Sequence, residues 1–206
     1  MTSFPRKLLI ATTNPSKRRE MEQILGAANL NLELLTLESF PDAQEVEETG
    51  ETFMENAHLK AQSAVQLSSL VVIADDGGLC IDALGGQPGI KSHRFLGEST
   101  SFQEKMTSIF KMMAEVEEEA RTCRFQCAVV IATPDGRTFE CLGVCEGRVG
   151  HEMLGEGGFG YDPLFALPDG RHTAELLPAE KHKISHRGQA LACAIEVLKS
   201  LFDATV

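Results

Sequence analysis

The chain has 206 residues and a formal net charge of −11, with 19 Lys and Arg against 30 Asp and Glu. This acidic balance argues against nucleic acid as a partner, because such binding rests on basic residues that neutralise phosphates. The length suits a single domain over residues 1–206. No apolar run is long enough for a membrane span, and residues 1–7 lack the apolar core of a signal peptide, so we expect no membrane contact and a cytoplasmic location.

The first predicted strand, residues 7–12, runs directly into a predicted helix. Asn14 suits the N-cap position of this helix and Pro15 its first position. Its first turns carry three cations, Lys17 among them, which oppose the positive end of the helix dipole. An anion in front of the helix would remove this conflict, so backbone N–H groups and Lys17 could form a phosphate cradle; a solvated basic face is the alternative. The candidate phosphate-binding residues are Thr12, Thr13, Asn14, Pro15, Ser16 and Lys17.

An acidic loop, residues 45–51, precedes the next predicted helix. Glu47 and Glu48 are candidate metal ligands in this loop, and the alternative is that its carboxylates are simply solvated. On the following helix, Lys60 lies four residues after Asn56, so the two side chains share one stripe of the helix. That stripe faces either a ligand or water.

A short apolar run, residues 71–74, is predicted as a buried strand that ends in Asp75, Asp76, Gly77 and Gly78. Ligands in open α/β sheets bind at the carboxyl ends of strands, and two acids held there suit a hard divalent cation. The alternative is an ordinary boundary between a strand and a turn, because Asp and Gly are common turn residues.

Six cysteines without a secretory signal indicate free thiols rather than disulfides. Two pairs, Cys123 with Cys127 and Cys141 with Cys145, lie on predicted strands on either side of a turn. Residues four apart on a strand share a face but are ~13 Å from each other. Because zinc bonds to sulfur are ~2.3 Å long, we expect small core residues here and no zinc site.

The second half of the chain contains a predicted helix over residues 100–116 and a predicted hairpin over residues 121–148. A glycine-rich loop, residues 155–163, follows them. Its aromatic rings could stack on a nucleobase and its acid could accept base N–H groups; a plain connecting loop is the alternative. The candidate residues in this loop are Phe159, Gly160, Tyr161 and Asp162.

Basic groups gather again at the start of the last predicted helix, for which Ser185 is a suitable N-cap. His186 and Arg187 could donate hydrogen bonds to a base carbonyl or to a phosphate. A surface role for both residues is the alternative from this segment alone.

Taken in order along the chain, these clusters resemble the Ham1-like inosine/xanthosine triphosphate pyrophosphatases. The segments that carry the resemblance are residues 12–17, 55–60, 74–76, 85–89, 159–163 and 185–190. The resemblance implies an α/β fold with a long mixed sheet flanked by helices, two lobes with a nucleotide cleft between them, and a homodimer. It also implies hydrolysis of a purine nucleoside triphosphate to the monophosphate and pyrophosphate.

The resemblance further implies a role for each cluster. Residues 12–17 and Lys60 would hold the triphosphate, and Asp76 would act as general base or metal ligand. Mg²⁺ would also be approached by Asp75 and by Glu47 or Glu48. The residues that would hold and select the base are Phe159, Gly160, Tyr161, Asp162, Lys181, His186 and Arg187.

The chain departs from the usual family pattern at two positions in these motifs. Thr13 stands where a glycine is common and restricts the loop backbone. Gly77 stands where a serine is common, so this residue beside the nucleotide lacks a hydroxyl donor. Neither departure removes a charged group, and both bear on affinity more than on the reaction class.

The chemistry of the clusters agrees with such a reaction. Pyrophosphate release needs water to attack the α-phosphorus while Mg²⁺ and lysines offset the charge of the substrate. Donors from His186 and Arg187 to O6 would select ITP, dITP and XTP, since the amino group of adenine would leave them unpaired. The alternatives are a pyrophosphatase for other modified nucleotides, as in the Maf-like enzymes, and a nucleotide sensor without turnover.

Overall fold

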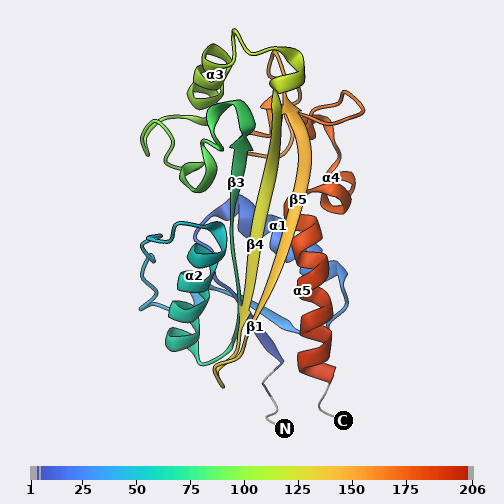
Figure 1. Cartoon of the computed structure of the whole chain (residues 1–206). Helices are drawn as coiled ribbons and strands as arrows, with labels where there is room; N and C mark the ends of the chain where they lie inside the picture. The colour runs from blue at the N-terminus through green and yellow to red at the C-terminus, as the bar shows by residue number, and fades with distance from the viewer. Residues whose placement is uncertain (1–3, 5, 204–206) are drawn as a thin grey trace. The chain divides into compact units, whose positions relative to one another are not determined.

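The computed structural model describes residue 4 and residues 6–203, so part of the segment considered for a signal peptide lies outside the described residues. It confirms the expected α/β class with a mixed sheet (Figure 1). The strands are β1 (Lys7–Ile10), β2 (Glu33–Thr36), β3 (Val71–Ile81), β4 (Thr122–Ala132), β5 (Thr138–Val149) and β6 (Phe165–Ala166). The helices are α1 (Pro15–Ala27), α2 (Phe53–Ser68), α3 (Phe102–Met112), α4 (Pro178–Ile184) and α5 (His186–Asp203).

The six strands form one sheet in the order β2-β1-β3-β4-β5-β6. β1 pairs in parallel with β2 and β3, whereas β5 and β6 are antiparallel. The chain divides into two compact units, each built from separate segments. The first unit holds the described residues up to Asp76, residues 127–143 and those from Arg187 on, and the second holds residues 77–126 and 144–186. The single domain and the cleft between lobes stay predictions.

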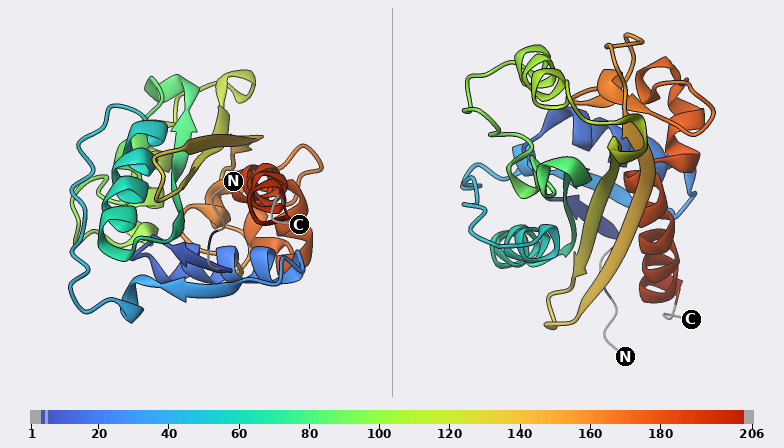
Figure 2. Two further views of the ribbon diagram at one scale, coloured as in Figure 1. Left: turned by 90° about the horizontal axis from the view of Figure 1, so that it is seen from below. Right: turned by 45° about the horizontal axis from the view of Figure 1, so that its top comes forward.

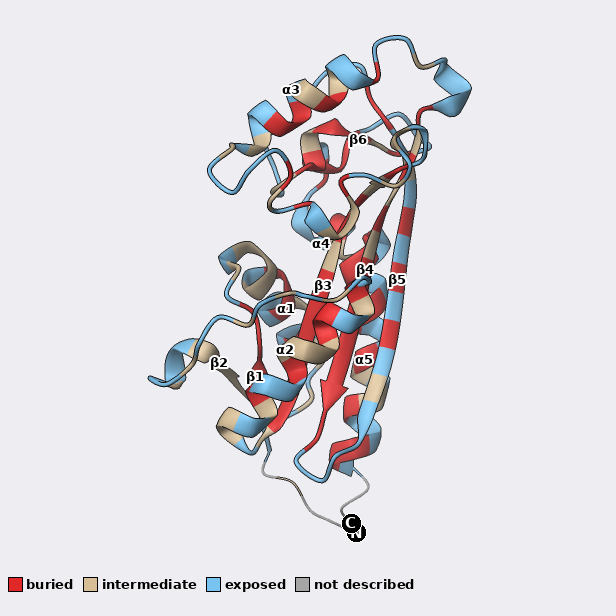
Figure 3. Cartoon of the chain, turned by 60° about the vertical axis from the view of Figure 1, so that its left-hand side comes forward, coloured by how far each residue is buried: buried red, intermediate tan, exposed pale blue. Residues whose placement is uncertain are grey.

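The first unit is a three-layered arrangement, with α2 on one face of its strands and α1 and α5 on the other (Figure 2). Leu8 and Ile73 point to the α1 and α5 side, where they join the same core cluster as Leu191. The alternate residues Leu9 and Val72 are also fully buried. Strands covered on both faces need a continuous apolar run, and this explains the sequence of β1 and of the first half of β3 (Figure 3).

The second unit has its own apolar core. It contains the buried side chains Leu79, Phe95, Ile109, Phe125, Tyr161, Leu164 and Phe165, among others. The rings of Phe125 and Phe165 stack with centroids 4.5 Å apart. Gly147 permits this packing, because a Cβ there would lie 2.4 Å from the Phe165 ring.

The predicted hairpin over residues 121–148 is confirmed as β4 and β5. Its turn is closed by a 3.0 Å hydrogen bond from Thr133 N to Arg137 O, and Gly136 takes a φ of +89°. β5 alternates between buried and exposed residues (Figure 3), as expected of a strand with one face in water.

β3 does not end at the two acids, so our prediction of a strand that stops at Asp75 was wrong. It continues through Gly77 and Gly78 to Ile81. The glycines serve close packing rather than a turn, since a Cβ on Gly78 would lie 2.2 Å from Ser92 Oγ. The neighbouring strand β1 does stop here, and its last paired residue opposes Ile73. The acids therefore follow the point where the parallel pairing ends.

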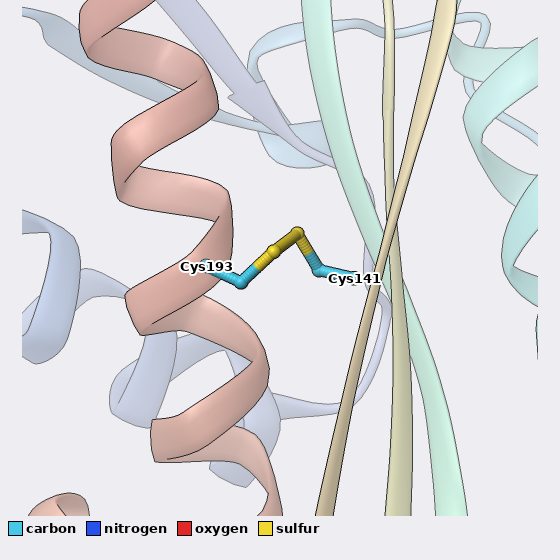
Figure 4. Close-up of a disulfide and its surroundings, with 2 residues drawn as sticks. All are labelled: Cys141 and Cys193. Atoms are coloured by element: carbon cyan, nitrogen blue, oxygen red, sulfur yellow. A yellow bond between two sulfur atoms is a disulfide. The ribbon is translucent and has the colours of Figure 1, made fainter.

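The cysteines also depart from expectation, because Cys141 and Cys193 form a disulfide (Figure 4). The bond joins the buried Cys141 on β5 to the exposed Cys193 on α5, 52 residues along the chain. Spacing within each strand could not reveal this pairing, which depends on where α5 packs. The other four cysteines are free, as predicted, and burial raises the pKa of the Cys145 thiol to about 11 and that of Cys127 to about 12.

Two helices differ in extent from the prediction. The helix expected over residues 100–116 is confirmed as α3 with narrower bounds, and Ser101 and Glu104 form its capping box. The short helix α4 was not predicted; it ends at Ser185, directly before α5. Among the helices of the described residues, none is long and apolar enough to cross a membrane.

Candidate active site

The start of α1 is organised by Asn14. Its side-chain oxygen accepts hydrogen bonds from the N–H groups of Ser16, at 3.0 Å, and Lys17, at 3.1 Å. Pro15 has no N–H, and Arg18 N donates to Asn14 O at 3.0 Å. The N–H groups that we expected to face a phosphate are thus engaged by the cap, and any phosphate binding at this helix start rests on side chains.

Lys17 is the one cation of the first helical turns that reaches the two acids of β3. Its Nζ lies 3.5 Å from Asp75 Oδ2 and 3.5 Å from Asp76 Oδ1. Burial by itself would lower the pKa of Lys17, but the two carboxylates outweigh it and raise the pKa above its ordinary value. Arg18 instead pairs with Glu38. Lys17 therefore stays protonated as a fixed positive charge at the site.

Asp75 and Asp76 face opposite sides of the sheet, because side chains alternate along a strand. Asp75 lies on the side of α1 and α5, where it contacts Arg187, and Asp76 lies on the side of α2, where it contacts Asn56. The two acids share only Lys17 among the printed ion pairs of both. They are two environments rather than one paired carboxylate site.

Asp75 belongs to a buried network of charges. Its Oδ2 accepts from Arg187 Nε at 3.1 Å, and Arg187 Nη1 donates to Glu20 Oε2 at 2.7 Å. Burial would raise the pKa of Asp75, but Lys17 and Arg187 hold that pKa well below its ordinary range. Among the described residues, no group donates a hydrogen bond to the buried Asp75 Oδ1.

Arg187 has a 2% exposed side chain and uses its donors on Asp75 and Glu20. The network holds two acids, Arg187 and Lys17, so burying it leaves no net charge uncompensated. Glu20 was missed in the sequence, although it lies three residues after Lys17 and hence on the same side of a helix. These contacts favour a positioning role for Arg187; its contact with a base stays a prediction.

Asp76 is held from α2. Asn56 Nδ2 donates to Asp76 Oδ2 at 3.1 Å, and Lys60 Nζ lies 3.8 Å from Asp76 Oδ1. Lys60 in turn donates to Glu48 Oε1 at 2.7 Å, whereas Glu47 is exposed. Of the two acids proposed as metal ligands in the loop, Glu48 is therefore the one linked to Asp76 through a shared lysine.

The donor set around Asp76 was tested for Mg²⁺. Carboxylate oxygens are the hard ligands that Mg²⁺ prefers, and the unpartnered Asp75 Oδ1 is an atom that a cation or water would satisfy. Within residue 4 and residues 6–203, no group of three or more His, Cys, Asp or Glu side chains is arranged to hold a metal. The residues fit Mg²⁺ in the usual way for this ion, with one or two carboxylates and the remaining ligands from substrate and water.

The second unit holds another buried polar cluster, centred on Asp162. Its Oδ2 accepts from Phe159 N at 2.7 Å and from Lys181 Nζ at 2.6 Å, and its Oδ1 from Thr173 Oγ1 at 3.1 Å. Asp162 therefore fixes the glycine-rich loop, and the base N–H contact we expected of it is a prediction that these bonds disfavour. Lys181 Nζ also lies 4.9 Å from the centre of the Phe159 ring.

The remaining predicted residues of the second unit differ in exposure. Tyr161 is buried and donates from its hydroxyl to Ser92 O at 2.9 Å. Phe159 and Gly160 are half-buried, as is Gly77. The imidazole of His186 is buried and stacks on Phe125, with ring centres 4.8 Å apart. Phe159, rather than Tyr161, is the aromatic ring with surface to offer a base.

Gly158 provides a test of the Asp162 cluster. Its φ is +68°, and a Cβ there would lie 2.0 Å from Asp162 Oδ2. We expect Gly158→Ala to displace the carboxylate from Lys181 and to lower the free energy of unfolding by about 2 kcal/mol more than backbone strain alone. Gly85→Ala is the matched control, because Gly85 has a φ of +63° with nothing within 4 Å. Equal urea midpoints for the two variants would contradict this account.

The chain was compared with known proteins. The model of the Ham1 family matches residues 8–197. The chain is 42% identical to a dITP/XTP pyrophosphatase of Desulforamulus reducens over 95% of this chain and 97% of that protein. It is 44% identical to a dITP/XTP pyrophosphatase of Geobacillus kaustophilus over 90% of this chain and 91% of that protein.

The fold has solved relatives as well. The structure of a HAM1 protein from Coxiella burnetii superposes with a TM-score of 0.85 at 36% identity, covering 94% of this chain and 98% of that chain. A match of this extent in sequence and in fold, together with the resemblance carried by the separate motifs, leads to one conclusion: this chain belongs to the Ham1 family.

Proposed function

We propose that this chain hydrolyses non-standard purine nucleoside triphosphates, ITP, dITP and XTP, to the monophosphate and pyrophosphate. The proposal draws on the relatives named dITP/XTP pyrophosphatases. The observation that carries it is the cluster in the first unit, where Lys17 and Lys60 flank Asp76 Oδ1 at 3.5 Å and 3.8 Å. A carboxylate between two lysines is suited to a reaction in which water attacks a highly charged phosphate chain.

In the proposed mechanism, Lys17 and Lys60 offset the negative charge of the triphosphate, which they bind as point charges. Asp76 orients the attacking water and takes its proton as general base. Mg²⁺, held by Asp76 with Asp75 and Glu48 near it, would supply Lewis-acid stabilisation of charge on the phosphate oxygens when bound. Thr12 and Thr13 contribute hydroxyl groups beside Lys17, since the backbone N–H groups of the helix start are engaged by Asn14.

The second unit is assigned the base. The half-buried Phe159 ring stacks on it, and Asp162 and Lys181 keep the loop that carries Phe159 in place. His186, stacked on Phe125, donates to the O6 carbonyl of hypoxanthine or xanthine. Adenine has an amino group at this position, and pairing two donors leaves both unsatisfied. Arg187 supports Asp75 in this scheme.

A nucleotide panel tests the proposal. With Mg²⁺ present, we expect kcat/KM for ITP, dITP and XTP to exceed that for ATP by at least about 100-fold, the effect of one mismatched hydrogen-bonding group. Pyrophosphate and monophosphate are quantified together and should appear in equal amounts. Equal rates with ATP would remove the selectivity argument, and binding without pyrophosphate release would leave a sensor instead of an enzyme.

Three further properties are proposed with this function: Mg²⁺ dependence, a homodimer and a cytoplasmic location. The carboxylate donors support the metal, and the nucleotide substrate supports a location where nucleotide pools are held. Loss of pyrophosphate release in EDTA with recovery on added Mg²⁺ tests the first. Light scattering of the purified chain tests the second, and cell fractionation tests the third.

A further inference from the structure

Asn56 on α2 is a fully buried amide that uses both of its polar ends. Its Oδ1 accepts from Gly50 N at 2.8 Å, and its Nδ2 donates to Asp76 Oδ2 at 3.1 Å. A backbone N–H can only donate, so the contact with Gly50 fixes which end of the amide is oxygen. The end that faces Asp76 is therefore the donor.

We infer that Asn56 is a positioning residue for Asp76, an inference that rests on the proposed function. Its donor occupies Asp76 Oδ2 and thereby sets the rotation of the carboxylate. Oδ1 is then the oxygen turned toward Lys17 and Lys60. Asn56 in this way selects Oδ1 as the atom that meets the attacking water.

The same amide ties the acidic loop to the strand. Gly50 lies two residues after Glu48, whose carboxylate accepts from Lys60 at 2.7 Å. Asn56 binds the loop backbone with one end and Asp76 with the other, so the loop acid and the strand acid are held in one frame. Both links lie within the first unit.

A purely structural role does not explain this residue. The buried positions next to it on the same helix, Ala57 and Ala61, are apolar. A buried amide adds no stability over an apolar side chain unless both ends are paired. Here one partner is the carboxylate proposed to activate water, which gives the polar side chain a task that an apolar one could not perform.

Gly50 offers a second way to disturb Asn56. A Cβ at Gly50 would lie 2.7 Å from Asn56 Oδ1 and 2.7 Å from Glu55 Cβ. Gly50→Ala therefore displaces the amide while every functional group of the site remains. Gly26→Ala is the matched control, because Gly26 lies on α1 with nothing within 4 Å of its Cβ position.

The test is a double-mutant cycle of Asn56→Leu with Asp76→Asn. We expect Asn56→Leu to lower kcat by about 10- to 100-fold in the unmodified chain but by less than threefold in the Asp76→Asn background, because Asn56 acts through that carboxylate. Gly50→Ala should lower kcat as Asn56→Leu does, and Gly26→Ala should leave it unchanged. An α,β-imido analogue of ITP, titrated in EDTA, should bind all these variants within threefold of the unmodified chain.

The outcomes separate the two levels of the argument. An equal loss of kcat in both backgrounds, or full activity of Asn56→Leu and Gly50→Ala, would overturn the role of Asn56 alone. Full activity of Asp76→Asn, or no hydrolysis of any nucleotide in the panel, would overturn the proposed function instead. If Asn56→Leu does not fold, Gly50→Ala alone and in the Asp76→Asn background decides the matter.

Discussion

Asp76→Asn is expected to lower kcat for ITP by about 10²- to 10⁴-fold, the usual contribution of a positioned general base. The amide has the shape of the carboxylate and can still accept from Asn56 Nδ2, so the fold is expected to survive. Its NH2 group then faces Lys17 and Lys60, where the carboxylate placed an acceptor. An amide nitrogen in that place can neither take a proton from water nor bind a cation.

The measurement is pyrophosphate release over a range of ITP concentrations, with thermal unfolding recorded on the same samples. KM should change by less than about tenfold, since both lysines remain to bind the triphosphate. Asp82→Asn is the matched control, because Asp82 follows the same strand but pairs with Arg124 and Thr122. Activity of Asp76→Asn within tenfold of the unmodified chain would contradict its role as general base.

Loss of the Cys141–Cys193 disulfide is expected to lower the free energy of unfolding by about 4 kcal/mol. The bond closes a loop of 52 residues, and this figure follows from the entropy that such a loop removes from the unfolded chain. For a chain of this size, it corresponds to a fall in Tm of roughly 10 °C. Cys193→Ser is the variant of choice, because Cys193 is exposed and Cys141 is part of the core.

Differential scanning calorimetry with and without dithiothreitol checks this prediction. Reductant should lower the Tm of the unmodified chain to that of Cys193→Ser and should leave the variant itself unchanged. Cys80→Ser is the control, since Cys80 is free and half-buried, and we expect a loss below about 1 kcal/mol there. Six titratable thiols in unreduced, denatured protein, in place of four, would contradict the disulfide.

The disulfide also bears on the proposed location. Reducing compartments keep most protein thiols reduced, and structural disulfides are rare there. Alkylation of thiols in acid-quenched cells, followed by mass measurement, counts how many molecules carry the bond. A fully oxidised population would contradict the cytoplasmic location, and a fully reduced one agrees with it.

Local chemistry is where the sequence was sufficient. Asn14 and Pro15 mark the start of α1 because a cap depends only on residues within one turn. The hairpin of β4 and β5 follows from alternation and from the turn at Gly136 for the same reason. The ordered motifs also predicted the family, since each is short and contiguous.

The sequence was less informative about strand length. Two glycines after two acids predicted a turn at Gly77, yet β3 continues to Ile81. Glycine adopts extended conformations as readily as turns, and at Gly78 it is required by the approach of Ser92, 14 residues away along the chain. The choice between a turn and close packing depends on that distant neighbour.

The opening half of β3 shows the division between the two sources of information. The sequence by itself determined that a buried strand carries Asp75 and Asp76 and that basic groups gather at Lys17. Only the tertiary structure decided that Asp75 meets Arg187, 112 residues on, and that Asp76 meets Asn56. Caps and turns form from hydrogen bonds between near neighbours, whereas the environment of each acid depends on which helix covers which face of the sheet, and that is fixed by packing of the whole chain.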